Sequence, residues 1–402
     1  FFSTLNESVA TVMYTDLVND FEKSITTIQW VTTAFVIVLA IGMVFSSFMA
    51  KHLYMRTIFF TGDIFFTGGS LVCVFANSFI LLIIGRVIQG IGTALLMPQI
   101  SNIVIIMAPR HRLGFYNGVT MLVVITGNAL GPTLSGLITR FLGWRYVFAL
   151  LIPIPVIGGI AGYWTMGNVV EQEKSNLDIL SAILAILGYG GISFGLGNTG
   201  THGFGSVIVI VSLSVGVVCL ILFYVWENYC KSPIISMNNL GKPYFIINIF
   251  LSVVNSSSML GWLAILPFII QNYLNKSVFI SGISLLPGGL LNASLNLLAD
   301  NIKLWVIIVG YALFNIGIPI IFSVYTSSAL TSVPPQSSPH AAAIFHSFFQ
   351  LSGSLGSAIY VAILNNFTDV SFNSSKHPLI NGASICFLVT LSLNVFIFIM
   401  AI

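Results

Sequence analysis

Long uncharged runs separated by short polar turns dominate the hydrophobic pattern of the chain. Phe79 to Ala108 holds a single charged residue, Arg86, in thirty positions, and Leu113 to Thr139 holds none. The polar turn 109–112 lies between them. About 20 consecutive apolar residues are long enough to cross the core of a bilayer. The pattern therefore predicts two membrane-spanning helices joined by a short basic turn.

Apolar runs of this kind recur along the whole chain. We expect thirteen helices, at about 1–18, 25–50, 57–76, 79–107, 113–138, 144–166, 178–197, 205–226, 244–272, 278–299, 303–326, 340–366 and 379–402. Composition agrees, because 56% of the residues are hydrophobic and only 6% are charged, against about 25% in soluble domains. The chain is predicted to be an all-α polytopic membrane protein without a sizeable soluble domain.

The candidate chemistry is not that of an enzyme. The four cysteines are scattered, and no His, Asp or Glu residues cluster at the spacing of metal ligands or of a nucleophile and its base. No Gly-rich phosphate loop is present, which argues against ATP as an energy source. We therefore expect no catalytic or metal site and no cofactor, and the net charge of +3 says little about partners.

Arg86 is the charge that most needs an explanation. A cation at membrane depth costs a few kcal/mol or more, so it is expected to face a cavity or an acid. Gln89, Gly90 and Thr93 follow it by three, four and seven residues, which places them on the same side of a helix. The spacing predicts a polar face around Arg86, with Gln89 as a candidate substrate-binding residue.

A ridge of small residues marks the next predicted helix. Gly127, Gly131 and Ser135 are spaced four apart, and such a ridge lets another helix approach closely. Pro132 removes a backbone hydrogen bond and is expected to bend or stiffen this helix. Together with Gly90 and Gly136, these residues form the candidate conformational motif.

The first run contains the main candidate for proton coupling. Glu7 lies near its middle, and Thr11 and Tyr14 share its face. An ionised carboxylate at this depth is costly, so its charge state is switchable, as a coupling or substrate site requires. The alternative is a carboxyl permanently paired with Arg86 or another buried donor.

Two further acids are candidates with equally plain alternatives. Asp16 either pairs with Arg86 or gates the outer mouth, and the alternative is a solvated helix-end acid beside Asp20 and Glu22. Asp63, inside the third run, is favoured as a structural partner for loop cations.

The second half of the chain offers polar groups in place of charges. Asn255 lies inside an apolar run, and His346 and Gln350 share one helix face at a spacing of four. These three are candidate substrate-binding residues, and His346 is also a candidate proton site, because histidine is the side chain that changes charge near neutral pH. The alternative for each is a hydrogen bond between helices.

Three motifs resemble those of a known family. Arg86-Val-Ile-Gln89-Gly90-Ile-Gly92 to Pro98 resembles the fourth-helix signature of the major facilitator superfamily, and Gly127 to Gly136 resembles the fifth-helix signature of its antiporters. Gly143-Trp144-Arg145 resembles the turn into the sixth helix. Over nearly the whole chain, the sequence is similar to the fourteen-span drug:proton antiporters, the EmrB/QacA-type multidrug exporters.

The sequence departs from the family's pattern at two positions. The family's loop between helices 2 and 3 carries an acid that helps to latch the cytoplasmic side, but Lys51 stands there. The family's first-helix acid corresponds to Asn6, so giving the proton role to Glu7 assumes a shift of one residue.

The resemblance implies two six-helix bundles and two inserted helices. We expect the N-terminal bundle at 1–170, the inserted helices with their flanking loops at 171–242, and the C-terminal bundle at 243–402. The layout of Pro98 to Gly136 recurs from Pro319 to Ala358, and parallel repeats must keep one orientation. Thirteen spans would invert the second copy, so one helix is expected to be missing near 300–303. A true thirteen-span protein is the alternative.

Loop charges set the expected orientation. Lys51, Arg56, Arg110, Arg112, Lys174, Lys231 and Lys242 fall on one side, and Lys23, Arg140, Arg145 and Lys276 on the other. The first side is predicted to be cytoplasmic, together with the N-terminus, in a bacterial plasma membrane.

The resemblance implies proton-coupled efflux of amphipathic, often cationic drugs by alternating access, in a monomer that binds no nucleic acid. Export of an endogenous anion such as a fatty acid or peptide is the first alternative, and a membrane sensor without transport is the second.

Overall fold

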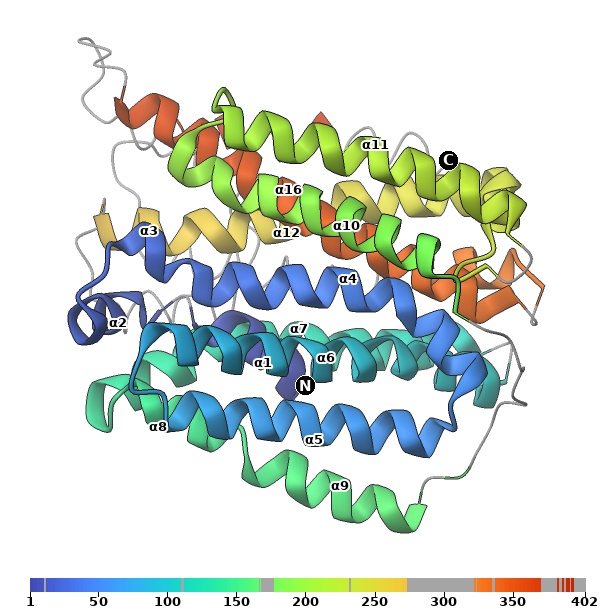
Figure 1. Ribbon diagram of the computed structural model, residues 1–402, viewed down its shortest axis with the longest axis horizontal. Helices are drawn as coiled ribbons and strands as arrows, with labels where there is room; N and C mark the ends of the chain where they lie inside the picture. Colours follow the sequence, from blue (N-terminus) through green and yellow to red (C-terminus); the bar gives the residue numbers. More distant parts are fainter. Residues whose placement is uncertain are drawn as a thin grey trace.

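In the computed structural model, the chain is a bundle of long helices that run roughly along one direction (Figure 1). The structure describes residues 1–165, 167, 177–230, 233–272, 322, 324–334 and 337–369, apart from Thr11, Arg110 and His111, and scattered residues between 382 and 393. Within these residues, nine helices are long and apolar enough to cross a membrane, and there is no strand. The prediction of an all-α membrane protein is confirmed.

Helices α1 to α9 form the first part of the chain. Their bounds are α1 (Phe2–Val9), α2 (Tyr14–Phe21), α3 (Ile25–Ile28), α4 (Trp30–His52), α5 (Met55–Val74), α6 (Phe79–Met107), α7 (Leu113–Phe141), α8 (Trp144–Leu150) and α9 (Pro153–Thr165). The helix predicted at 79–107 has the observed bounds of α6. Pro132 lies inside α7 without ending it.

Two predicted spans are each divided into two helices. The run 1–18 is not one helix, because α1 ends at Val9 and α2 begins at Tyr14. The hydroxyl of Ser135 donates to the Val9 carbonyl at 2.8 Å, which satisfies a group that the end of α1 leaves without a helical partner. The run 144–166 breaks before Pro153, whose ring permits the first position of a helix but not its interior.

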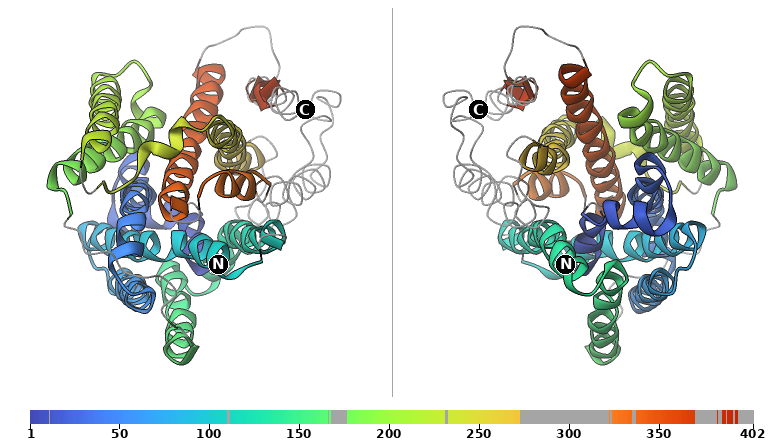
Figure 2. Two further views of the ribbon diagram at one scale, coloured as in Figure 1. Left: turned by 90° about the vertical axis from the view of Figure 1, so that its right-hand side faces the viewer. Right: turned by 90° about the vertical axis from the view of Figure 1, so that its left-hand side faces the viewer.

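Helices α10 (Ile179–His202) and α11 (Val207–Tyr229), which correspond to the two helices expected between the bundles, pack against each other. Figure 2 shows them on the flank of the bundle, where α10 contacts α4 and α16. Asp178 caps α10 by accepting the Ser181 N–H at 2.8 Å, and the indole N–H of Trp226 also donates to it at 2.7 Å. These hydrogen bonds lower the pKa of the Asp178 carboxyl. They also tie the start of α10 to the end of α11.

The second half of the described chain contains η2 (Met237–Gly241), α12 (Pro243–Asn272) and α16 (Ser338–Asp369). Small residues of α16 lie on α12: a Cβ at Gly356 would overlap the Ser257 carbonyl, and Ser257 Oγ donates to the Ser352 carbonyl at 2.8 Å. The run predicted at 278–299, most of the runs at 303–326 and 379–402, and the helix expected to be missing near 300–303 lie outside the described residues.

The bundle has two ends, which we name by the turns of α4. At the α4–α5 end, α4 finishes at His52, and α10, α12 and α16 begin. At the α3–α4 end, α4 begins at Trp30 and α10 finishes at His202. One apolar core surrounds α1 and includes Leu5, Val9 and Phe148. A second joins α4, α10, α12 and α16 through Val44, Tyr189, Phe245 and Phe345, and so connects the first part of the described chain to its last helices.

Candidate substrate and proton site

Arg86 is fully buried and is held by hydrogen bonds in place of an ion pair. Its Nε donates to the Val31 carbonyl of α4 at 2.8 Å. Its Nη1 donates to the Asn6 side-chain oxygen at 2.8 Å and to the Asn6 carbonyl at 3.2 Å. The guanidinium also lies 4.4 Å from the centre of the Phe35 ring, a cation–π distance. These contacts fix the cation between α1, α4 and α6.

Gln89 completes this arrangement one turn along α6. Its side-chain oxygen accepts from Arg86 Nη1 at 3.1 Å, and its side-chain nitrogen donates to Ser70 Oγ of α5 at 2.8 Å. Both groups of the amide are therefore used inside the bundle, so the prediction that Gln89 binds substrate gains no support from the geometry. Arg86 Nη2 remains without a partner among the described residues.

Glu7 forms its hydrogen bond with the other half of the protein. Gln350 of α16 donates its side-chain N–H to Glu7 Oε1 at 3.1 Å, across 343 residues of sequence. No ion pair joins Glu7 to Arg86 within the described chain. Asn6, at the position of the family's acid, is the residue that contacts Arg86. The two neighbours thus have different tasks: Asn6 holds the cation, and Glu7 faces the central contact between the halves.

The remaining candidates on α1 and α2 are spread over different environments. Tyr14 donates its hydroxyl to Thr32 of α4 at 2.7 Å, and Thr11 lies outside the described residues. Asp16 is exposed at the start of α2 and does not contact Arg86. The expectation that it pairs with Arg86 is wrong, because the Asp16 side chain is exposed whereas Arg86 is fully buried. Asp16 matches the alternative, a solvated acid at a helix end.

Candidates on α12 and α16 lie near the central contact. His346 is half-buried one turn before Gln350 on α16, and Asn255 is buried on α12. The neighbouring Ser256 donates to the Phe349 carbonyl at 2.9 Å, which holds α12 against the same part of α16. Asp63 is half-buried at the contact between α5 and Gly159 of α9, away from this region.

The motif glycines lie where helix backbones come closest. A Cβ at Gly131 would overlap Ser8 Oγ and lie 2.9 Å from the Leu5 carbonyl, and one at Gly127 would lie 2.7 Å from the Phe1 carbonyl. At Gly90 it would lie 3.1 Å from the Phe35 carbonyl of α4. Gly136 is less crowded, with Val12 Cγ1 at 3.4 Å. The ridge of α7 thus receives α1 and sets the position of Asn6 and Glu7.

Sequence reasoning missed two hydrogen bonds between the halves. Ser47 of α4 bonds to His340 of α16 through Oγ and Nδ1 at 2.7 Å, and both side chains are buried. Asn117 of α7 donates to Ser327 at 3.1 Å. Both bonds lie toward the α4–α5 end. Single Ser, Asn and His residues in apolar runs gave no signal of this pairing.

Similarity to known proteins agrees with this architecture. The family model described as Major Facilitator Superfamily matches residues 1–357. Lincomycin resistance protein LmrB of Bacillus subtilis (strain 168) is 29% identical, over 94% of this chain and 86% of its own. Lincomycin resistance protein LmrB of Listeria innocua is 30% identical, over 91% and 84%. A solved peptide transporter POT in complex with sulfate has a TM-score of 0.56 at 15% identity, over 100% of this chain and 92% of that one.

The fold and the family match define a multi-pass membrane transporter rather than an enzyme. The chain belongs to the Major Facilitator Superfamily. The family model, the curated relatives and the solved structure each cover most of the chain.

Proposed function

We propose that this protein exports amphipathic, cationic drugs in exchange for protons, with Glu7 as the group that carries the proton and meets the drug. The observation that carries the proposal is the hydrogen bond from Gln350 to Glu7 at 3.1 Å, which puts a carboxyl of one half against the other half. Alternating access requires the halves to separate and rejoin. A proton on Glu7 would change the contact with Gln350, which must break when the halves separate.

The fixed charge of Arg86 gives the site two electrostatic states. With Glu7 ionised, the carboxylate offsets Arg86 and attracts a cation. With Glu7 protonated, only the positive charge of Arg86 remains, and a bound cation is repelled in an environment that screens charge poorly. Arg86 cannot leave, because Asn6, Val31 and Gln89 hold it. Proton entry at Glu7 therefore favours drug release, and proton loss restores binding.

The relatives support drugs as the substrate class, since the LmrB proteins are named for lincomycin resistance. We also propose that the transporter is a monomer in a bacterial plasma membrane, with the α4–α5 end and the N-terminus on the cytoplasmic side. The excess of Lys and Arg in the loops of that side supports this orientation.

One observation favours a second candidate, export of an endogenous anion. Arg86 Nη2 is buried and has no partner in the described part of the chain. A carboxylate of a fatty acid or peptide that reached it would gain a charge-assisted hydrogen bond. A sensor that binds such molecules without transport would use the same contacts.

The test is ethidium efflux from vesicles under an imposed proton gradient, comparing the parent with Glu7→Gln. We expect gradient-driven efflux in the parent and its collapse in the variant, while ethidium binding at fixed pH survives. Asp16→Asn is the matched control, because this acid is exposed, and it should keep full efflux.

Full efflux by Glu7→Gln would overturn the role of Glu7 and direct the search to Asp63, which is half-buried on α5. Absence of efflux by a correctly folded parent would favour the anion exporter or the sensor. Gradient-driven export of a fatty-acid anion in place of ethidium would then separate those two.

A further inference from the structure

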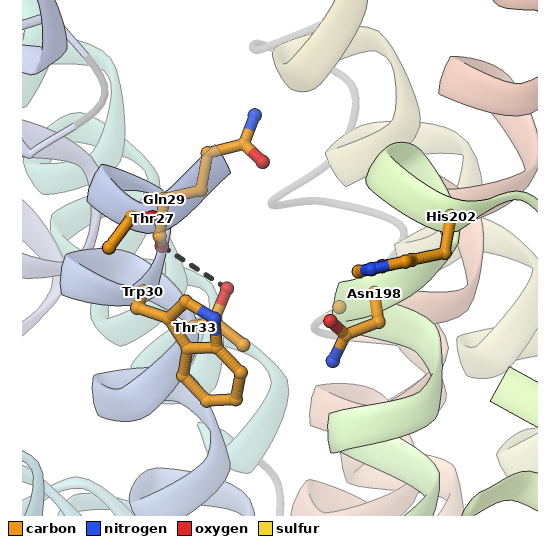
Figure 3. A pocket seen from close by; sticks show the side chains of 7 residues that line it. Thr27, Gln29, Trp30, Thr33, Asn198 and His202 are labelled. Atoms are coloured by element: carbon orange, nitrogen blue, oxygen red, sulfur yellow. Dashed lines mark hydrogen bonds between the residues drawn. The ribbon is translucent and has the colours of Figure 1, made fainter. Parts of the chain in front are cut away.

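A pocket of about 210 Å³ lies at the α3–α4 end, between the first turn of α4 and the last turn of α10 (Figure 3). Its lining residues are Thr27, Gln29, Trp30, Thr33, Gly197, Asn198 and His202. None of them belongs to the central site around Glu7 and Arg86. The pocket joins the first half of the protein to an inserted helix, so it forms only when both parts are assembled.

Close packing below the pocket defines its floor. A Cβ at Gly197 would lie 2.7 Å from Thr33 Cγ2, so glycine allows α10 to touch α4 at this level. Beyond it, α10 ends at His202, and Gly203 turns the chain away with φ +73°. That value suits glycine and is rare for other residues. The turn carries the chain away just beyond His202, where α10 ends beside the pocket.

The lining combines an aromatic ring with uncharged polar groups. Trp30 is held against Phe194, with ring centres 5.3 Å apart, so its position is set before any ligand arrives. Within the described chain, neither the indole N–H of Trp30 nor the side-chain amide of Gln29 has a hydrogen-bond partner. In Figure 3, Asn198 and His202 lie across the pocket from Trp30 and Thr33. An aromatic surface with a few polar groups around it is typical of small-molecule sites.

The charge of the lining selects among ligand classes. It contains no Asp, Glu, Lys or Arg, so an ionic ligand would lose its hydration without a fixed counter-charge. An uncharged ring with hydroxyl groups fits better, because its C–H face can lie on Trp30 while its hydroxyls reach amides and hydroxyls that both donate and accept. The volume suits one such ring.

We propose that this pocket is a second ligand site, which binds a single uncharged, hydroxyl-rich ring such as a hexopyranoside. The inference stands apart from the proposed drug export, because it uses none of the same residues. The ring has two possible sources, a free saccharide or the head group of a glycolipid, since the pocket lies at the end of the membrane-spanning helices.

The experiment measures binding to the purified full chain in phosphatidylcholine nanodiscs. Methyl β-D-glucopyranoside is the free probe, and nanodiscs that contain a monoglucosyl diacylglycerol provide the lipid source. Choline and acetate serve as charged probes. We expect saturable binding of the glucoside by calorimetry, and competition between the glucoside and the glycolipid. The tighter of the two identifies the source.

Two variants and one control locate the site. Trp30→Leu removes the aromatic surface and should weaken binding on the order of tenfold. Gln29→Ala removes an amide that bonds to nothing in the described fold, so it should weaken binding without changing the melting temperature. Trp164→Leu is the control, because this tryptophan is 81% exposed on α9 and far from the pocket.

Binding is measured in place of transport, because the first turn of α4 also contributes to the central site, where the Val31 carbonyl accepts a hydrogen bond from Arg86. Loss of transport in Trp30→Leu would therefore not identify a pocket. The proposal is overturned if neither glucoside nor glycolipid binds saturably, if Gln29→Ala and Trp164→Leu bind equally well, or if the charged probes bind as tightly as the glucoside.

Discussion

At the scale of single residues, a buried arginine is held by neutral groups where a salt bridge would be expected. A buried charge costs several kcal/mol unless hydrogen bonds compensate it. Arg86 receives two carbonyls, two side-chain amide oxygens and the ring of Phe35. Because these partners of Arg86 include no carboxylate, the Glu7 carboxyl is available to accept the hydrogen bond from Gln350.

Asn6→Ala tests this division of tasks. The variant removes the side-chain acceptor at 2.8 Å from Arg86 Nη1. Loss of one partner of a buried charged group costs about 1–3 kcal/mol, so we expect a matching fall in the free energy of unfolding, measured by denaturant titration in detergent micelles. Asn6→Asp, which keeps an acceptor, should remain at least as stable as the parent. Equal stability of Asn6→Ala and the parent would contradict the assigned role.

The sequence predicted part of this site. Arg86 and Gln89 were placed on one face by helical spacing, and they do bond to each other. The choice between Asn6 and Glu7 was not accessible, because it depends on how α1 is rotated about its axis. That rotation is set by packing on α7, far along the chain. Ser70, the partner of Gln89, lies on α5 and left no trace in the local pattern.

At the scale of elements, the small-residue ridge of α7 decides where α1 lies. Gly127 and Gly131 bring the two backbones together, and Ser135 bonds to the end of α1. The spacing of these residues predicted a close helix neighbour but could not say which one. The same spacing could not show that α1 ends at Val9, where the hydroxyl of Ser135 on another helix binds the free carbonyl. The break before Pro153 did have a local signal, the proline itself.

Gly131→Ala and Gly136→Ala form a matched pair for this contact. Both exchange glycine for a better helix former, so their local effects are alike. In Gly131→Ala the new Cβ would overlap Ser8 Oγ and crowd the Leu5 carbonyl, whereas in Gly136→Ala it would meet only Val12 at 3.4 Å. We expect the first variant to melt lower and to lose gradient-driven ethidium efflux, and the second to resemble the parent. Similar behaviour of both would show that the ridge does not position α1.

At the scale of the whole molecule, the halves are joined toward the α4–α5 end. Ser47 with His340, and Asn117 with Ser327, bond across the halves there, and Val44 and Phe345 share one apolar core. Lys51 stands where the family carries an acidic latch, and hydrogen bonds between side chains join the two halves toward this end. Composition and run length predicted the membrane bundle, but the polar pairs, 293 and 210 positions apart, appear only once the helices are assembled.

If the protein works by alternating access, the contact between α4 and α16 must open in every cycle. Cysteines at Ser47→Cys and His340→Cys, in a background without Cys73, Cys219, Cys230 and Cys386, should be linked by a short bifunctional thiol reagent, since the native side chains bond at 2.7 Å. We expect the link to stop ethidium efflux and a reducible version to release the block. Ser47→Cys with Asn198→Cys, at opposite ends of the bundle, should give no link. Full efflux by the linked protein would mean that this end stays closed throughout transport, which would require a path between the halves that does not pass Ser47 and His340.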